Sequence, residues 1–191
     1  MISADDTPDG GGGGKGRPAG VADALYYRRN GPEMDFESTR RVLEAFEREG
    51  VRYVVFGGAA LNLLGLARFT EDLDLFIAPE VGNIERVKHA LRSVFDDPSI
   101  EEISATDLLG AYPAVQYVPP TGEFHLDLIT RLGEAFAFAD IKSARVAFGF
   151  LTVSVATPDT LYKMKRHTVR LRDRADAELL RQRFGLKDED A

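Results

Sequence analysis

Three aspartates in this sequence lie in or at the start of apolar strands, where a carboxylate is unfavourable without a nearby cation. Asp72 and Asp74 lie two residues apart at the start of an apolar strand, so their side chains are predicted to project from one face while Leu73 and Leu75 enter the core. Two adjacent like charges are unfavourable unless a divalent or basic group lies between them. An isolated Asp-x-Asp pair is also common at solvent-facing loop ends, so the pair alone does not define a site.

The third aspartate, Asp127, favours a metal site. It lies in a strand predicted over residues 124–129, where alternation places the apolar side chains on one face and Asp127 on the other. An unpaired acid in the middle of an apolar strand is costly and requires a metal or another cation. Mg²⁺ suits such carboxylates, because it takes hard oxygen ligands and leaves positions for water and substrate phosphate.

Gly57 and Gly58 form a second feature that is typical of phosphate chemistry. They lie between an apolar strand predicted over residues 51–56 and a short helix predicted over residues 59–66. Glycine lets the backbone pass close to a ligand, and the free N–H groups at the start of a helix attract a phosphate. The two glycines are therefore expected to contact a phosphate group.

The elements that must position these residues alternate between strand and helix periodicity. Residues 36–50, which Asp35 can cap, and residues 83–95 are predicted helices, and residues 73–77 are a predicted strand. The remaining predictions are an antiparallel strand pair over 115–118 and 124–129, a hairpin within 145–155 bent at Gly149, and helices over 159–168 and 172–184. Residues 100–112 fit neither period. The fold class is α/β (α+β), a mixed β-sheet flanked by helices, with two C-terminal helices.

Charge is concentrated in one segment of the 191-residue chain. The formal net charge is −7, yet residues 161–187 hold nine basic and three acidic residues, so this segment carries +6 and the remainder −13. This distribution indicates a local site for phosphate or a nucleic-acid backbone, although a solvated helix face would give the same pattern. The absence of cysteine excludes a disulfide framework, a thiolate metal site and a cysteine nucleophile.

The first 34 residues are predicted to be a flexible glycine-rich tail, and residues 35–187 a single domain. Five consecutive glycines occupy positions 10–14. The G-x-G-x-x-G spacing of Gly11, Gly13 and Gly16 lacks the preceding strand and following helix of a dinucleotide site. The start of the chain lacks the basic and apolar regions of a signal peptide, and no apolar run is long enough to span a bilayer. A cytoplasmic location is expected.

The sequence resembles the nucleotidyltransferases of the polymerase β superfamily. The resemblance rests on Gly57-Gly58-Ala59-Ala60, then Arg68-Phe69-Thr70-Glu71-Asp72-Leu73-Asp74, with an acid on a later strand. Among these enzymes it is most similar to the AbiEii-type toxins, whose Leu-x-x-x-Lys and basic-Asp-x-x-Asp helices resemble residues 161–165 and 172–176. The resemblance covers about residues 36–184. It implies a nucleotidyltransferase fold, a nucleoside triphosphate substrate and, for a toxin, an antitoxin partner.

In such an enzyme a hydroxyl attacks the α-phosphate of the triphosphate and pyrophosphate leaves, with two Mg²⁺ ions stabilising the attacking and leaving oxygens. Asp72 and Asp74 would bridge both ions, and Asp127 would hold the ion beside the attacking hydroxyl and accept its proton. We expect Lys165 to act on the triphosphate as a point charge. Nucleotide binding is also assigned to four residues near the aspartates: Gly57, Gly58, Arg68 and Thr70.

Three alternatives concern the acceptor and the activity. The basic C-terminal helices favour RNA, such as a tRNA end, over the small-molecule acceptors of antibiotic-modifying adenylyltransferases, which usually carry a helical domain that this chain is too short to contain. Ala59 replaces the Ser or Thr usual in the superfamily, which suggests a non-catalytic nucleotide- or partner-binding protein as an alternative.

The three histidines are too scattered for a zinc site, and His125 is expected to face away from Asp127 and to be buried.

Overall fold

The computed structural model describes residues 36–110, 113–120 and 125–187, so the predicted tail and the proposed cap at Asp35 lie outside the described residues. Its helices are α2 (Phe36–Arg48), α3 (Gly57–Leu63), α4 (Val81–Arg92), α5 (Ala105–Leu109), α6 (Pro158–Lys165) and α7 (Leu171–Phe184). Two 3₁₀ helices are η1 (Pro98–Glu102) and η2 (Phe138–Asp140). The strands are β1 (Tyr53–Val55), β2 (Asp72–Ile77), β3 (Ala114–Tyr117), β4 (His125–Ile129), β5 (Arg131–Leu132), β6 (Phe136–Ala137), β7 (Ser143–Phe148) and β8 (Leu151–Ala156).

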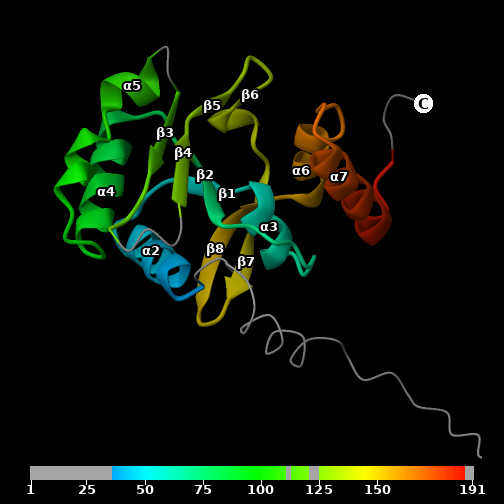
Figure 1. The fold of residues 1–191 in the computed structure, drawn as a ribbon, viewed down its shortest axis with the longest axis horizontal. Coiled ribbons are helices and arrows are strands. Elements are labelled where there is room, and N and C mark those ends of the chain that lie inside the picture. The colour runs from blue at the N-terminus through cyan, green and yellow to red at the C-terminus, as the bar shows by residue number, and fades with distance from the viewer. Residues whose placement is uncertain (1–35, 111–112, 121–124, 188–191) are drawn as a thin grey trace, which may run out of the picture. The chain divides into compact units, whose positions relative to one another are not determined.

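The main sheet has six strands in the order β3-β4-β2-β1-β8-β7 (Figure 1). The pairs β2/β4 and β1/β8 are parallel, whereas β1/β2, β3/β4 and β7/β8 are antiparallel. Strands β5 and β6 form a separate small hairpin. The predicted mixed sheet flanked by helices is confirmed, and β2 and β4 are direct neighbours in its interior.

Alternation along β2 and β4 separates a core face from a polar face. Leu73 and Leu75 of β2 and Leu126 and Leu128 of β4 are fully buried and join one apolar core with side chains of α2 and α4. Helices α2 and α4 pack against each other, and α6 packs against α7 (Figure 1). The aspartates of both strands lie on the opposite face from these leucines, as the period-2 pattern predicts.

Several boundaries differ from the sequence predictions. Helix α3 includes Gly57 and Gly58 as its first residues, and α4 begins at Val81 and ends at Arg92. The segment that fitted neither period contains η1 and α5, whereas the β5–β6 hairpin was not predicted. The predicted hairpins are confirmed as β3/β4 and β7/β8, although part of the first turn, residues 121–124, lies outside the described residues. No helix in the described part of the chain has the length and apolarity needed to cross a membrane.

Candidate active site

The parallel register of β2 and β4 brings the predicted aspartates together. Asp74 lies opposite Asp127, and Asp72 lies opposite His125. Because residues two apart on a strand share a face, these four side chains project from the same face of the sheet. The edge strand β3 adds Gln116 opposite Asp127, and its Nε2 donates to Asp127 Oδ1 at 3.0 Å. The three carboxylates therefore occupy neighbouring positions on two adjacent strands.

The carboxyl group of Asp74 is strongly perturbed by its surroundings. Burial, followed by the charges of Asp127 and Asp72, raises the pKa of Asp74 to about 7, against smaller lowering effects from the Gly58 N–H and Lys165. The Gly58 N–H belongs to the first turn of α3, so a carboxylate of the site interacts with the helix start that the sequence suggested for a phosphate. An acid with this pKa needs a counter-charge to be fully ionised near neutral pH.

Positions 57 and 58 have no room for a Cβ, because the Asp74 carboxylate and the loop at Thr70 lie close to the backbone there. A Cβ on Gly57 would lie 1.9 Å from Asp74 Oδ2, and the backbone there has a φ of +63°. A Cβ on Gly58 would lie 2.8 Å from Thr70 Cβ. Thr70 Oγ1 in turn accepts from the Asp72 N–H at 3.3 Å and lies 3.2 Å from the Asp72 carbonyl oxygen. The close approach predicted for a ligand is thus already made by Asp74 and Thr70.

The prediction for His125 is wrong. His125 Nδ1 lies 3.3 Å from Asp72 Oδ1, on the same face as Asp127, and its side chain is partly exposed. The error is one of strand geometry, because His125 and Asp127 are separated by one residue and therefore point the same way. His89 and His167, both predicted to lie on helix surfaces, are exposed; His89 lies on α4, whereas His167 follows the end of α6.

Lys165 lies in a buried ion-pair network that joins the C-terminal helices to the loop before β2. Its Nζ is 2.7 Å from Asp173 Oδ1 and 3.0 Å from Asp176 Oδ2. Asp176 also pairs with Arg68, whose Nε lies 2.9 Å from Asp176 Oδ1. Asp173 and Asp176 reach one lysine together because they are three residues apart on α7 and share a helix face. The two predicted nucleotide-binding cations therefore share one buried carboxylate, to which sequence reasoning gave no role.

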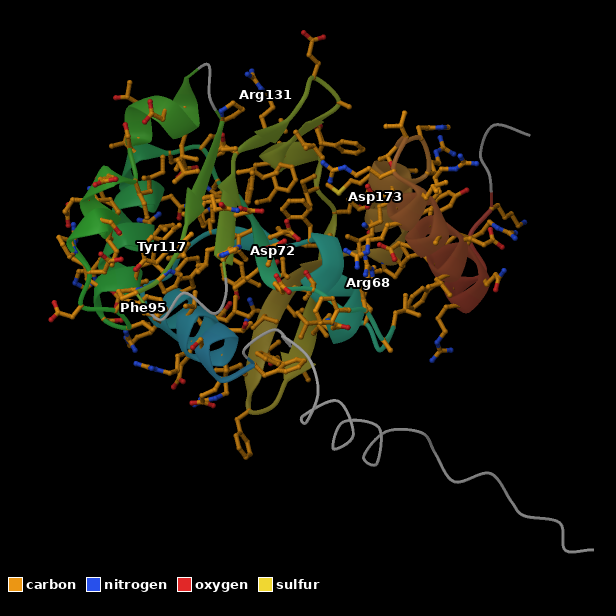
Figure 2. All side chains as sticks on the ribbon, viewed as in Figure 1. Arg68, Asp72, Phe95, Tyr117, Arg131 and Asp173 are labelled. Atoms are coloured by element: carbon orange, nitrogen blue, oxygen red, sulfur yellow. The ribbon has the colours of Figure 1, made fainter. Side chains whose placement is uncertain are left out.

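One cavity of about 940 Å³ collects the predicted site. All eight residues named from the sequence line it: Gly57, Gly58, Arg68, Thr70, Asp72, Asp74, Asp127 and Lys165. Figure 2 shows Asp72 on β2 with Arg68 and Asp173 on the side where α6 and α7 lie. The volume falls within the range of small-molecule sites, and carboxylates and cations face each other across it.

The donor set suits a hard divalent cation. Three carboxylates share one face, and their mutual repulsion contributes to the raised pKa of Asp74, which a cation would relieve. Among the described residues, however, no three acidic or histidine side chains are arranged to hold an ion as they stand. A shared ion therefore requires rotation of these side chains.

Most of the chain matches a protein-family model. Residues 41–183, three quarters of the chain, match the model described as "Nucleotidyl transferase AbiEii toxin, Type IV TA system". The match contains every candidate site residue and the whole ion-pair network of α6 and α7. A comparison with curated proteins gave no match.

Solved structures share the fold at low sequence identity. The antibiotic-resistance factor ANT(2'')-Ia matches in a solution structure at 11% identity and TM-score 0.50, covering 78% of this chain and 84% of that one. Its crystal structure with adenylyl-2''-tobramycin matches at 12% identity and TM-score 0.51, covering 78% and 89%. A nucleotidyltransferase candidate from Thermotoga maritima matches at 13% identity and TM-score 0.47, covering 78% and 91%.

Proposed function

Because the chain belongs to the AbiEii family of nucleotidyltransferases, we propose that it transfers a nucleoside monophosphate from a nucleoside triphosphate to a hydroxyl group of RNA, with Mg²⁺ as cofactor. The observation that carries this proposal is the register that sets Asp74 opposite Asp127 and Asp72 opposite His125 in one cavity. Such a set of carboxylates has little use in a protein that only binds a partner, since the acids repel one another.

The three aspartates have separate roles in the proposed reaction. Asp72, Asp74 and Asp127 would hold two Mg²⁺ ions, which would stabilise the charge on the attacking and leaving oxygens when bound. The acceptor oxygen forms a bond to the α-phosphorus, the bond from that phosphorus to the bridging oxygen breaks, and pyrophosphate leaves. Asp127 accepts the proton of the attacking hydroxyl, because it lies at the outer end of the carboxylate row beside Gln116.

Lys165 is proposed to act on the triphosphate from within its ion-pair network. Its ammonium group has three N–H donors, and Asp173 and Asp176 take two of them in the structure. The third donor is available to a phosphate oxygen, while the carboxylates hold the side chain in place. Lys165 already influences the site, since its charge lowers the pKa of Asp74. Ala59 supplies no hydroxyl to the phosphates, so Lys165 and backbone N–H groups carry this contact.

RNA is the proposed acceptor because basic residues gather next to the cavity. Residues 161–187 carry a net charge of +6, and Arg170 and Arg172 from this segment line the cavity. A phosphate backbone is the matching partner for such a segment. The family description supports a role as the toxin of a type IV toxin–antitoxin system, with an antitoxin partner. We propose that it acts in the cytoplasm, where RNA and nucleoside triphosphates are available.

The test is transfer of label from each of the four α-labelled nucleoside triphosphates, with Mg²⁺, to total RNA, to tobramycin and to the protein itself. We expect label in RNA with a preferred nucleotide and none from the γ-labelled form. Asp74→Asn should abolish the transfer. Asp96→Asn, at an exposed acid that does not line the cavity, should leave it unchanged. Label confined to tobramycin, or absent throughout, would refute the RNA assignment.

A further inference from the structure

An exposed aromatic side chain stands in the wall of the active-site cavity. Phe69 lies in the loop between α3 and β2, one residue before Thr70, and is 47% exposed although it lines the cavity. The loop is anchored on both sides of it. The Arg68 N–H donates to Asn62 Oδ1 at 2.7 Å, and the Arg68 guanidinium donates to the Phe69 carbonyl oxygen at 2.9 Å. These hydrogen bonds fix the backbone that carries the ring, and about half of the side chain is exposed to solvent.

Apolar and basic side chains alternate from Val169, between α6 and α7, to Arg172 in the first turn of α7, and this stretch contributes to the same cavity. Val169 is 95% exposed, and it is followed by Arg170, Leu171 and Arg172, all of them exposed. Val169, Arg170 and Arg172 line the cavity. In contrast to Lys165 and Arg68, which are held by buried carboxylates, Arg172 forms no ion pair with any residue in the described part of the chain.

We propose that Phe69, Val169, Arg170 and Arg172, here called the rim, bind the unpaired terminal nucleotides of the RNA acceptor, with the Phe69 ring stacked on a base. This inference rests on the proposed function and adds the form of the acceptor, a single-stranded end. An aromatic platform beside cations is the combination that binds single-stranded nucleic acid, since bases stack and phosphates pair with arginine. A duplex keeps its bases stacked on one another and offers no free face to the ring.

The charges of the rim favour the acceptor over the base of the nucleoside triphosphate. The phosphates of the triphosphate belong at the carboxylates, Gly57, Gly58 and Lys165, so the base end of that molecule brings no further negative charge. An oligonucleotide carries a phosphate beside every base. Arginines that line the same cavity as an exposed ring therefore match a polynucleotide end.

The chain contains no tryptophan, so Phe69→Trp creates a single fluorescent reporter at the rim. Stacking on a base is expected to quench this emission when a short single-stranded RNA is added in EDTA, where no transfer can occur. A blunt RNA duplex and heparin, which supply phosphate or charge without free bases, should leave it unchanged. Quenching by nucleoside triphosphate alone and not by RNA would overturn the proposal, as would equal quenching by the duplex.

Affinity for the same RNA separates stacking from simple apolar contact. Phe69→Leu, which keeps an apolar side chain and removes the ring, should weaken binding roughly tenfold, while Phe69→Trp preserves it. Phe150→Leu is the matched control, because Phe150 is fully exposed on the β7–β8 turn and does not line the cavity. Arg172→Gln should lower the salt dependence of binding by about one released counterion.

Different results would contradict the rim proposal and the proposed function. If wild-type protein transfers label to RNA and Phe69→Leu binds RNA as tightly as Phe150→Leu, the rim proposal is wrong and the proposed function stands. If wild-type protein transfers no label to RNA although single-stranded RNA quenches the Phe69→Trp reporter, the rim binds as proposed and the proposed function is wrong.

Discussion

Asp74 lies directly opposite Asp127 in the parallel register of β2 and β4, and both side chains line the same cavity. The relationship is fixed by the sheet, because the core-facing leucines on either side of each aspartate set which face the acids occupy. The fold thereby buries Asp74 and holds repelling charges next to it, and burial together with the charges of Asp127 and Asp72 raises the pKa of Asp74 to about 7. A divalent cation bound at this face would remove that repulsion.

Mg²⁺ is expected to stabilise the wild-type protein. Ligand that binds only the folded state raises the midpoint of thermal unfolding, and a saturating excess of a specific ion corresponds to a rise of several degrees, roughly 3–6 °C. Asp74→Asn should lose most of this rise, whereas the surface variant Asp96→Asn should keep it. Thermal melts with and without Mg²⁺ measure the effect, and an equal rise in all three proteins would argue against a site at Asp74.

Without metal, Asp74 should make the protein less stable as pH rises. Its folded-state pKa of about 7 lies above the ordinary value of 3.8 for an aspartate, so the folded state binds the extra proton. The stability that this proton provides is present below pH 3.8 and is lost between about pH 4 and 7. Denaturant titrations in EDTA at pH 8 should show Asp74→Asn to be more stable than wild type by about 1–3 kcal/mol. No gain over wild type at pH 8 would show that burial and repulsion do not destabilise the ionised Asp74.

Gly57→Ala should damage the site more than its backbone strain explains. The new Cβ would lie 1.9 Å from Asp74 Oδ2 and force that carboxylate away, so we expect nucleotide transfer to fall by a factor of about 100 or more. Gly65→Ala is the control, because Gly65 has a φ of +81° and no atom within 4 Å of the added Cβ. It should cost about 1 kcal/mol of stability and leave transfer intact. Equal activity of the two variants would contradict the contact with Asp74.

Asp176→Asn should destabilise the protein by about 2–4 kcal/mol, because it leaves Lys165 and Arg68 with a missing partner in a buried place. Asp159→Asn gives the comparison on α6 itself, since Asp159 pairs with Lys163 at 3.1 Å in a partly exposed position. That change should cost under about 1 kcal/mol. Urea unfolding of both variants measures the difference, and similar losses would mean that the network contributes little.

The sequence allowed prediction of the strands, helices and aspartates that depend on local pattern. Leucine alternation in β2 and β4 predicted which face each aspartate takes. The glycines were predicted to lie close to a phosphate, and in the structure Asp74 and Thr70 make that close approach. The same alternation rule, wrongly applied, misplaced His125, which lies two residues from Asp127 and shares its face. Gln116 could have been found in the same way, as the outward residue of an edge strand that pairs with β4.

Features that depend on distant pairing could not be predicted. Nothing local shows that β2 pairs with β4 in parallel, that β1 pairs with β8, or that Asp176 on α7 bonds Arg68 more than a hundred residues earlier. These contacts arise from the packing of elements far apart in the chain. The short β5–β6 hairpin was missed because two-residue strands leave no periodicity to detect.

The rate of nucleotide transfer by Asp127→Asn tests the central claim most directly. With the labelled nucleotide and acceptor that wild type prefers, we expect the initial rate to fall roughly 10³-fold, because a metal ligand and proton acceptor is lost. Nucleoside triphosphate affinity should remain close to that of wild type, as should the transfer rate of Asp96→Asn. Transfer by Asp127→Asn and Asp74→Asn at the wild-type rate would show that the paired carboxylates of β2 and β4 do not carry the reaction.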